Sequence, residues 1–209
     1  MSIDLLKNNI KRYVTLTPEQ ENIISNAVIY KTYKRGQFIN MQGEVNRYTH
    51  FITKGSARVF YVDPEGQEHS IQLALKDWWT GDFTSFITRS PGDLFTEALE
   101  YTETIMFSYE QLQLLYEKVP PMERFYRLIL QKAYAAFQQR VLQTLSMDAE
   151  HRYQAFRKAY PEMDRQIPQK HIASYLGVSA EFLSKIKKRI MLNEKAIRSI
   201  PTVHNYLYQ

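Results

Sequence analysis

The chain has 209 residues, 44% hydrophobic and 13% aromatic, enough to bury the core of one large or two modest domains and too apolar for general disorder. It contains no cysteine, which excludes disulfides, thiolate zinc sites, cysteine-ligated iron–sulfur clusters and a cysteine nucleophile. No apolar run approaches the roughly 20 residues that span a bilayer. The first residues, MSIDLLKNNIKRY, lack the layout of a signal peptide, so we expect a cytoplasmic protein.

The net charge of +5 is concentrated at one end of the chain. Residues 1–149 carry 16 Lys and Arg against 17 Asp and Glu, a net charge of −1, whereas residues 150–209 carry 11 against 5, a net charge of +6. A localised basic segment suits a polyanion, most often nucleic acid. The simpler interpretation is a solvated basic surface, so charge alone leaves both open.

Residues 1–30 are predicted to be helical, with Thr17-Pro18-Glu19 in the pattern of a helix start. Residues 31–109 hold six of the seven glycines, separated by short β-rich runs. The sequence Asp63-Pro64-Glu65-Gly66 predicts a hairpin turn between two of these runs. Short strands at this spacing predict an antiparallel sandwich or jelly roll. Of the adjacent Trp78 and Trp79, we expect one ring inside the roll and the other at a seam to a helix.

A long helix is predicted over residues 121–147, which contain neither Gly nor Pro after the first residue. An apolar stripe recurs along it at three- to five-residue steps. A helix of this length after a compact β unit is either a packed core helix or a dimer seam. The residues predicted for the dimer interface are Phe125, Ile129, Ala133, Ala136 and Val141.

The segment QKHIASYLGVSAEFLSKIKK, residues 169–188, carries the spacing of a helix-turn-helix. Ala173 is small where a second helix would cross, and Gly177 can adopt positive φ to end the first helix. Ser179 is placed to cap the second helix. The apolar positions are Ile172, Leu176, Val178, Leu183 and Ile186. A plain αα-hairpin shares the glycine and the apolar spacing, so the full pattern within a +6 segment is what favours DNA recognition.

In this geometry the second helix lies in the major groove. Lys185 is the candidate for a guanine edge, and Glu181 for the amino group of cytosine. Lys187, Lys188 and Arg189 are predicted to contact phosphates. The residues predicted to contact DNA are Gln169, Lys170, Ser179, Ala180, Glu181, Ser184, Lys185, Lys187, Lys188 and Arg189.

A β-roll, a long helix and a helix-turn-helix, in this order, resemble the CRP/FNR family of bacterial transcription regulators over roughly residues 15–190. The motifs DPEGQE and GDF in the roll add to the likeness. The resemblance implies an α+β fold: an N-terminal antiparallel β-roll (jelly roll) with flanking helices, a long dimerisation helix and a C-terminal winged-helix-like helix-turn-helix domain. The expected units are an effector domain at 1–120, a dimerisation helix and hinge at 121–149, and a DNA-binding domain at 150–209.

The resemblance also implies partners. We expect a homodimer on a near-palindromic operator in double-stranded DNA, contact with RNA polymerase and a small-molecule effector in the roll. Family members that read the best-known operator carry Arg-Glu-x-x-x-Arg at the start of the second helix. The matching residues here are Ala180, Glu181 and Lys185, so we expect a different operator.

The effector is also expected to differ. Members that bind cyclic AMP have Gly-Glu for the ribose and, eleven residues after that Gly, Arg-Ser for the phosphate, whereas this chain has Gly81-Asp82 and Gly92-Asp93. An Arg–phosphate bond contributes about 1.5–3 kcal/mol, and a carboxylate about 4 Å from the phosphate opposes binding by roughly 4 kcal/mol at an effective dielectric constant near 20. We predict another effector or none; a cyclic-nucleotide site rearranged around Arg89 is an alternative. The candidate pocket residues are Gly81, Asp82, Phe83, Arg89, Gly92 and Asp93.

Two other interpretations remain. A small-molecule-binding or metal-dependent cupin-like roll needs two histidines one residue apart, whereas His50 and His69 are nineteen apart, so neither metal nor cofactor is predicted. A roll that binds nothing and serves only to dimerise is the other. No Walker loop, G-x-G-x-x-G, H-E-x-x-H or G-x-S-x-G motif occurs, so no enzymatic activity is predicted.

Overall fold

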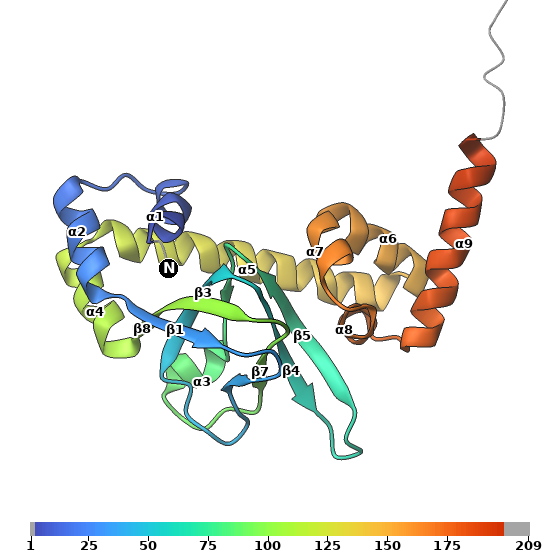
Figure 1. Cartoon of the computed structure of the whole chain (residues 1–209), viewed down its shortest axis with the longest axis horizontal. Helices are drawn as coiled ribbons and strands as arrows, with labels where there is room; N and C mark the ends of the chain where they lie inside the picture. The colour runs from blue at the N-terminus through green and yellow to red at the C-terminus, as the bar shows by residue number, and fades with distance from the viewer. Residues whose placement is uncertain (1–2, 199–209) are drawn as a thin grey trace, which may run out of the picture.

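The computed structural model describes residues 3–198, which form an α+β fold with the β-strands near the middle of the chain (Figure 1). Two helices come first, α1 Asp4–Lys11 and α2 Pro18–Ala27. The strands are β1 Ile29–Tyr33, β2 Phe38–Asn40, β3 Tyr48–Lys54, β4 Ser56–Val62, β5 Glu68–Leu75, β6 Trp79–Thr80, β7 Phe95–Ala98 and β8 Thr102–Ser108, with helix α3 Phe83–Thr88 between β6 and β7. The remaining helices are α4 Tyr109–Lys118, α5 Pro121–Ser146, α6 Ala149–Ala159, α7 Pro161–Gln166, α8 Gln169–Leu176 and α9 Ala180–Arg198.

The strands pair into two four-stranded antiparallel sheets, in the orders β1-β8-β3-β6 and β2-β7-β4-β5. Ile52 of the first sheet and Ala57 and Ala74 of the second form one buried cluster that joins the sheets. The predicted hairpin turn links β4 to β5, where the Asp63 N–H donates to Gln67 O at 3.0 Å. The antiparallel roll expected from the short strands is therefore confirmed.

The helix start at Thr17 is also confirmed. The Thr17 hydroxyl accepts a hydrogen bond from Gln20 N at 3.2 Å, and Gln20 Oε1 accepts one from Thr17 N at 3.0 Å. Pro18 stands in the first turn, where the helix needs no backbone donor. These reciprocal bonds satisfy two of the backbone donors that a helix start leaves without partners.

The two adjacent tryptophans face different parts of the molecule. Trp79 lies in the main core, with its ring 5.2 Å from Phe51 and 5.2 Å from Tyr126 of α5, measured between centroids. The Trp78 ring packs instead against Tyr160, the residue that joins α6 to α7, with 5.9 Å between the ring centroids. The expected division, one ring in the roll and one at a helix seam, is confirmed.

The long helix α5 enters the main core of the roll with its first turns. Met122, Phe125 and Tyr126 are buried in the main core, whereas residues 130–139 are exposed. Phe125 is fully buried, with its ring 5.6 Å from Tyr13, so it cannot also lie on an exposed seam. This corrects the expectation that Phe125 belongs to a dimer interface: its side of α5 seals the roll instead.

The described C-terminal part, residues 149–198, consists of the four helices α6 to α9, and no strand occurs in it. The winged variant of the helix-turn-helix therefore has no support within these residues, and residues 199–209 lie outside the described part. None of the helices described in residues 3–198 is both long and apolar enough to cross a membrane.

Two glycines of the roll, Gly55 and Gly66, both have positive φ but differ in the space available for a side chain. Gly55 has φ +86°, and a Cβ there would lie 2.5 Å from Tyr101 O and 2.8 Å from Thr102 Cα, whereas Gly66 has φ +82° with open space around it. Because an L-residue in this region costs about 1–2 kcal/mol, Gly66→Ala should lower the free energy of unfolding by about 1 kcal/mol. Gly55→Ala must also displace backbone and should cost about 3 kcal/mol or more. Urea unfolding of both variants measures this, and equal losses would contradict it.

Candidate nucleic-acid interface

The helix-turn-helix is formed by α8, a short turn and the start of α9. Gly177 has φ +69°, and its N–H donates to the carbonyls of Ala173 and Ser174, so α8 ends in a left-handed residue that a side chain would strain. Val178 N donates to Ala173 O at 3.0 Å and closes the turn. Gly177 therefore ends α8 with positive φ, as predicted from the sequence, and the turn leads the chain into α9.

Ser179 caps the second helix. Its hydroxyl accepts a hydrogen bond from Phe182 N at 3.1 Å, and its carbonyl accepts one from Leu183 N at 3.0 Å. A hydrogen bond from its own backbone and one from the Ser179 side chain lower the pKa of Glu181, which favours a carboxylate in the first turn of α9.

The two helices cross over a continuous apolar cluster. Ala173 is 1% exposed and packs in the cluster that also holds Ile172, Leu183 and Ile186. Gln169 adds a polar tie, because its Nε2 donates to Ala180 O at 3.3 Å. The spacing of apolar residues thus fixes which side of α9 faces inward.

The opposite side of α9 is polar and open. Glu181, Ser184, Lys185 and Lys188 are all exposed, and Ala180 is half-buried at the start of the helix. Lys170 is exposed in the first turn of α8, one residue after the half-buried Gln169. We call the outward residues Glu181, Ser184, Lys185 and Lys188 the reading face.

Two of the predicted phosphate contacts are instead held within the helical unit. Lys187 Nζ lies 2.9 Å from Asp164 Oδ1 and 5.3 Å from the centre of the Tyr153 ring. Arg189 forms an ion pair with Glu150 of α6. Both cations flank the reading face, because at 3.6 residues per turn Lys187 and Arg189 are rotated by roughly 120° and 80° from Glu181, whereas Lys188 is rotated by only about 20°.

The candidate effector residues surround a closed polar network. Asp82 is 1% exposed and caps α3, where its Oδ1 accepts a hydrogen bond from Ser85 N at 3.0 Å. The Ser85 hydroxyl in turn donates to Ser90 O at 2.6 Å and accepts from Asn46 N at 2.9 Å. A Cβ on Gly92 would collide with the Asp82 carboxyl Oδ2. The carboxyl group at the ribose-side position thus already has protein partners.

The other candidate side chains have different surroundings. The Arg89 guanidinium lies over the Tyr109 ring, 5.1 Å from its centre. Asp93 is exposed, and Phe83 is 51% exposed, on the outside of α3. Among the six candidate pocket residues, the structure brings Asp82 and Gly92 into contact and leaves Arg89 and Asp93 directed elsewhere.

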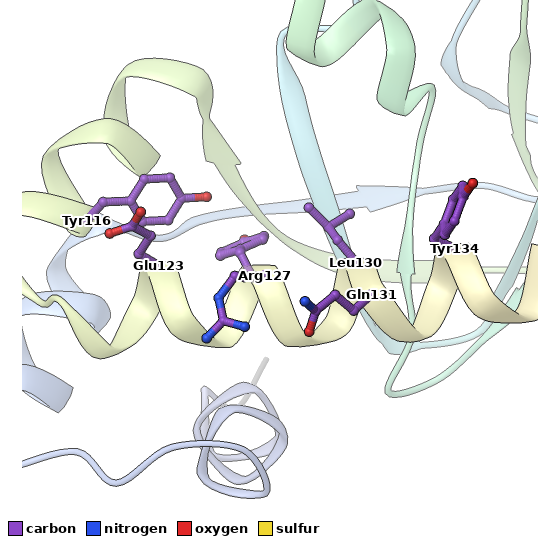
Figure 2. Close-up of a pocket in the computed structure, with 7 residues that line it drawn as sticks. Tyr116, Glu123, Arg127, Leu130, Gln131 and Tyr134 are labelled. Atoms are coloured by element: carbon purple, nitrogen blue, oxygen red, sulfur yellow. The ribbon is translucent and has the colours of Figure 1, made fainter.

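The exposed side of α5 carries large apolar side chains beside an open groove of about 470 Å³. Figure 2 shows Tyr116 of α4 beside Glu123, with Arg127, Leu130 and Tyr134 following along α5. The groove is also lined by Tyr126 and Gln131. Farther along α5, Phe137 and Val141 remain exposed, as do the smaller Ala133 and Ala136. Large exposed apolar residues in a row on one helix indicate a surface that another chain covers.

The histidines are too dispersed for a metal site in the described chain. In residues 3–198 no group of three or more His, Asp or Glu side chains is placed to hold a metal ion. His50 is 2% exposed beside the Tyr33 hydroxyl, and burial lowers the pKa of His50 to about 3. His69 instead pairs with Asp63 in the hairpin.

Comparison with known proteins supports the architecture. Residues 30–119 match the family model of the cyclic nucleotide-binding domain. The chain is similar to the solved structure of FixK2 from Bradyrhizobium japonicum, with 16% identity, 80% of this chain and 86% of that chain covered and a TM-score of 0.69. A regulator of the crp/fnr family from Eubacterium rectale gives 17% identity, 85% of each chain and a TM-score of 0.65. The Catabolite Activator Protein of Thermus thermophilus gives 20% identity, 89% and 88% coverage and a TM-score of 0.54. A search of curated proteins finds no match.

Proposed function

We propose that this chain, which has a cyclic nucleotide-binding domain in a fold shared with CRP/FNR regulators, is a sequence-specific DNA-binding transcription regulator. The observation that carries the proposal is the reading face: a capped helix with Lys185 and Lys188 exposed on the side opposite its buried residues. One of the solved structures that share this fold is described as a transcriptional regulator of the crp/fnr family, which supports the proposal. In this role the chain acts in the cytoplasm together with RNA polymerase.

The reading face suits the major groove. Lys185 is the residue for a guanine edge and Glu181 for a cytosine amino group, with Ser184 between them. Lys188 and Lys170 are the cations for phosphates, because both are exposed, whereas Lys187 and Arg189 have ion-pair partners within the helical unit. The half-buried Ala180 leaves room for a base pair where the best-known relatives place an arginine.

We further propose a homodimer paired in parallel along α5. The exposed side of α5 presents Arg127, Leu130, Tyr134, Phe137 and Val141. These positions follow one another at steps of three, four, three and four residues, the spacing of a two-stranded coiled coil. Dimerisation would cover the row of large apolar side chains, and two copies would offer two reading faces to a near-palindromic operator. In this scheme residues 1–120, 121–149 and 150–209 are the effector, dimerisation and DNA-binding units.

We propose that the roll responds to an effector other than cyclic AMP, or to none. The buried Asp82 carboxyl group already caps α3 and approaches Gly92, and Arg89 lies over Tyr109. At the phosphate-side position this chain has Gly92 and the exposed Asp93 in place of an arginine, so an Arg–phosphate bond that contributes about 1.5–3 kcal/mol is missing.

Lys185 and Lys188 should respond differently to substitution. Lys185→Ala should weaken specific operator binding by about 1–3 kcal/mol and relax the preference at one base position. Lys188→Ala should weaken binding to all sequences alike and reduce the slope of log K against log salt by about one, because one phosphate contact is lost. The operator is first selected from a random DNA pool, and titrations at several salt concentrations then compare the variants. Unchanged affinity in both variants would remove α9 from the interface.

The dimer seam can be located with two neighbouring substitutions. Phe137→Glu should raise the dimer dissociation constant at least about 100-fold, because two carboxylates would be buried against apolar side chains. Ala136→Glu, one residue away on the same exposed stretch, should leave it nearly unchanged. Sedimentation equilibrium measures both. The reverse outcome would move the seam to the small residues Ala133 and Ala136.

Calorimetry tests the effector proposal directly. Cyclic AMP and cyclic GMP should each bind the purified protein more weakly than about 10 μM, a binding free energy less favourable than about −7 kcal/mol. Tighter binding of either nucleotide would establish the alternative, a cyclic-nucleotide-responsive regulator with a rearranged phosphate site.

A further inference from the structure

The outer edge of the second sheet is closed by side chains from outside the roll. Strand β5 is the last strand in the order β2-β7-β4-β5, so its outward backbone groups have no neighbouring strand. Groups of this kind need partners or they invite pairing with another chain. In residues 68–71 the partners are Ser174 of α8 and Arg140 of α5. We call these bonds the edge contact.

Ser174 takes the place of a missing strand. Its hydroxyl donates to Glu68 O at 2.8 Å and accepts from Ser70 N at 2.9 Å, so one oxygen satisfies both a carbonyl and an N–H of the edge. Only a hydroxyl side chain of this size can donate and accept at once over so short a span. Ser174 lies in the first helix of the helix-turn-helix, between the half-buried Tyr175 and the buried Ala173.

Arg140 ties the long helix to the same strand. Its guanidinium donates to Ile71 O and, at 3.3 Å, to Ser70 O. The guanidinium also lies over the Tyr175 ring of α8, 4.2 Å from its centre. The roll, the long helix and the helix-turn-helix therefore meet at three residues of β5, Glu68, Ser70 and Ile71.

An apolar contact lies next to the edge contact. Leu73 and Leu75 of β5 are buried in the same cluster as Ile172 of α8 and Phe156 of α6. The Trp78 ring packs on Tyr160 beside it. The reading face stays exposed while this docking is complete. The contacts of the helix-turn-helix with β5 thus fix the direction of the reading face and leave it exposed.

We propose that Ser174 and Arg140 are positioning residues, which hold each helix-turn-helix on its own roll so that the two reading faces of a dimer match one spacing of half-sites. The inference rests on the proposed function. Binding of the second half-site is intramolecular, so its strength depends on the effective concentration at which the second reading face is presented. If the helix-turn-helix can rotate relative to its roll, the second reading face is seldom in the orientation that the second half-site needs. Affinity is then lost only for the operator with two half-sites.

The test compares Ser174→Ala with Ser174→Thr, which keeps the hydroxyl, and Arg140→Gln with Arg124→Gln, an exposed arginine of the same helix. Each protein is titrated with a single half-site and with two half-sites at a series of separations. Ser174→Ala and Arg140→Gln should bind the single half-site within about twofold of the unmodified protein. They should bind the preferred two-half-site operator about tenfold more weakly and discriminate less between separations. Ser174→Thr and Arg124→Gln should behave as the unmodified protein.

A second measurement does not depend on DNA. The Ser70 amide is protected by the Ser174 hydroxyl, so its hydrogen exchange, followed by NMR, should accelerate about tenfold or more in Ser174→Ala and stay slow in Ser174→Thr. Faster exchange with an unchanged separation preference would overturn the positioning role. An equal loss of affinity for one and for two half-sites would also overturn it, because the substitution would then have damaged the helix-turn-helix itself. If the unmodified protein bound no DNA at all, the proposed function would fail, and an unchanged exchange rate would separately refute the edge contact.

Discussion

An open sheet edge imposes a constraint that the rest of this molecule meets. The outward backbone donors and acceptors of β5 have no further strand beside them in the sheet order, and left open they would invite pairing with another chain. They are satisfied by a serine from the helix-turn-helix and an arginine from the long helix, which brings three units of the chain to one short segment. The orientation of α9, and of the reading face proposed to contact DNA, thereby depends on the roll. In a regulator, a change inside the roll then has a direct route to the reading face.

The elements that follow local rules could be predicted from the sequence. The start of α2 at Thr17, the turn after Asp63 and the end of α8 at Gly177 each depend on residues within four positions of one another. The crossing of α8 and α9 follows in the same way, because Ala173 and Leu183 occupy the buried positions of two adjacent helices. The outward side of α9 is then fixed by helical geometry, and with it the exposure of Lys185 and Lys188.

Contacts between distant segments could not be predicted. Ser174 and Ser70 are 104 positions apart, and nothing in either neighbourhood signals a bond between a hydroxyl and a strand edge. The periodicity of α5 predicts a dimer seam through Phe125, whose side chain instead lies in the main core, because periodicity gives the spacing of an apolar face and not its partner. Lys187 and Arg189 appeared available in sequence, since their partners Asp164 and Glu150 come from other helices.

The arrangement around Asp82 limits which substitutions the roll can accept during evolution. Removing the carboxyl group alone would uncap α3, and adding a side chain at Gly92 alone would collide with that carboxyl group. Placing a cation at position 92 therefore needs at least two substitutions, and each of them alone is expected to lower stability. Each single step toward such a cation is thus opposed by the fold. In a roll that takes a small-molecule effector, a new site would arise more readily on another surface than at position 92.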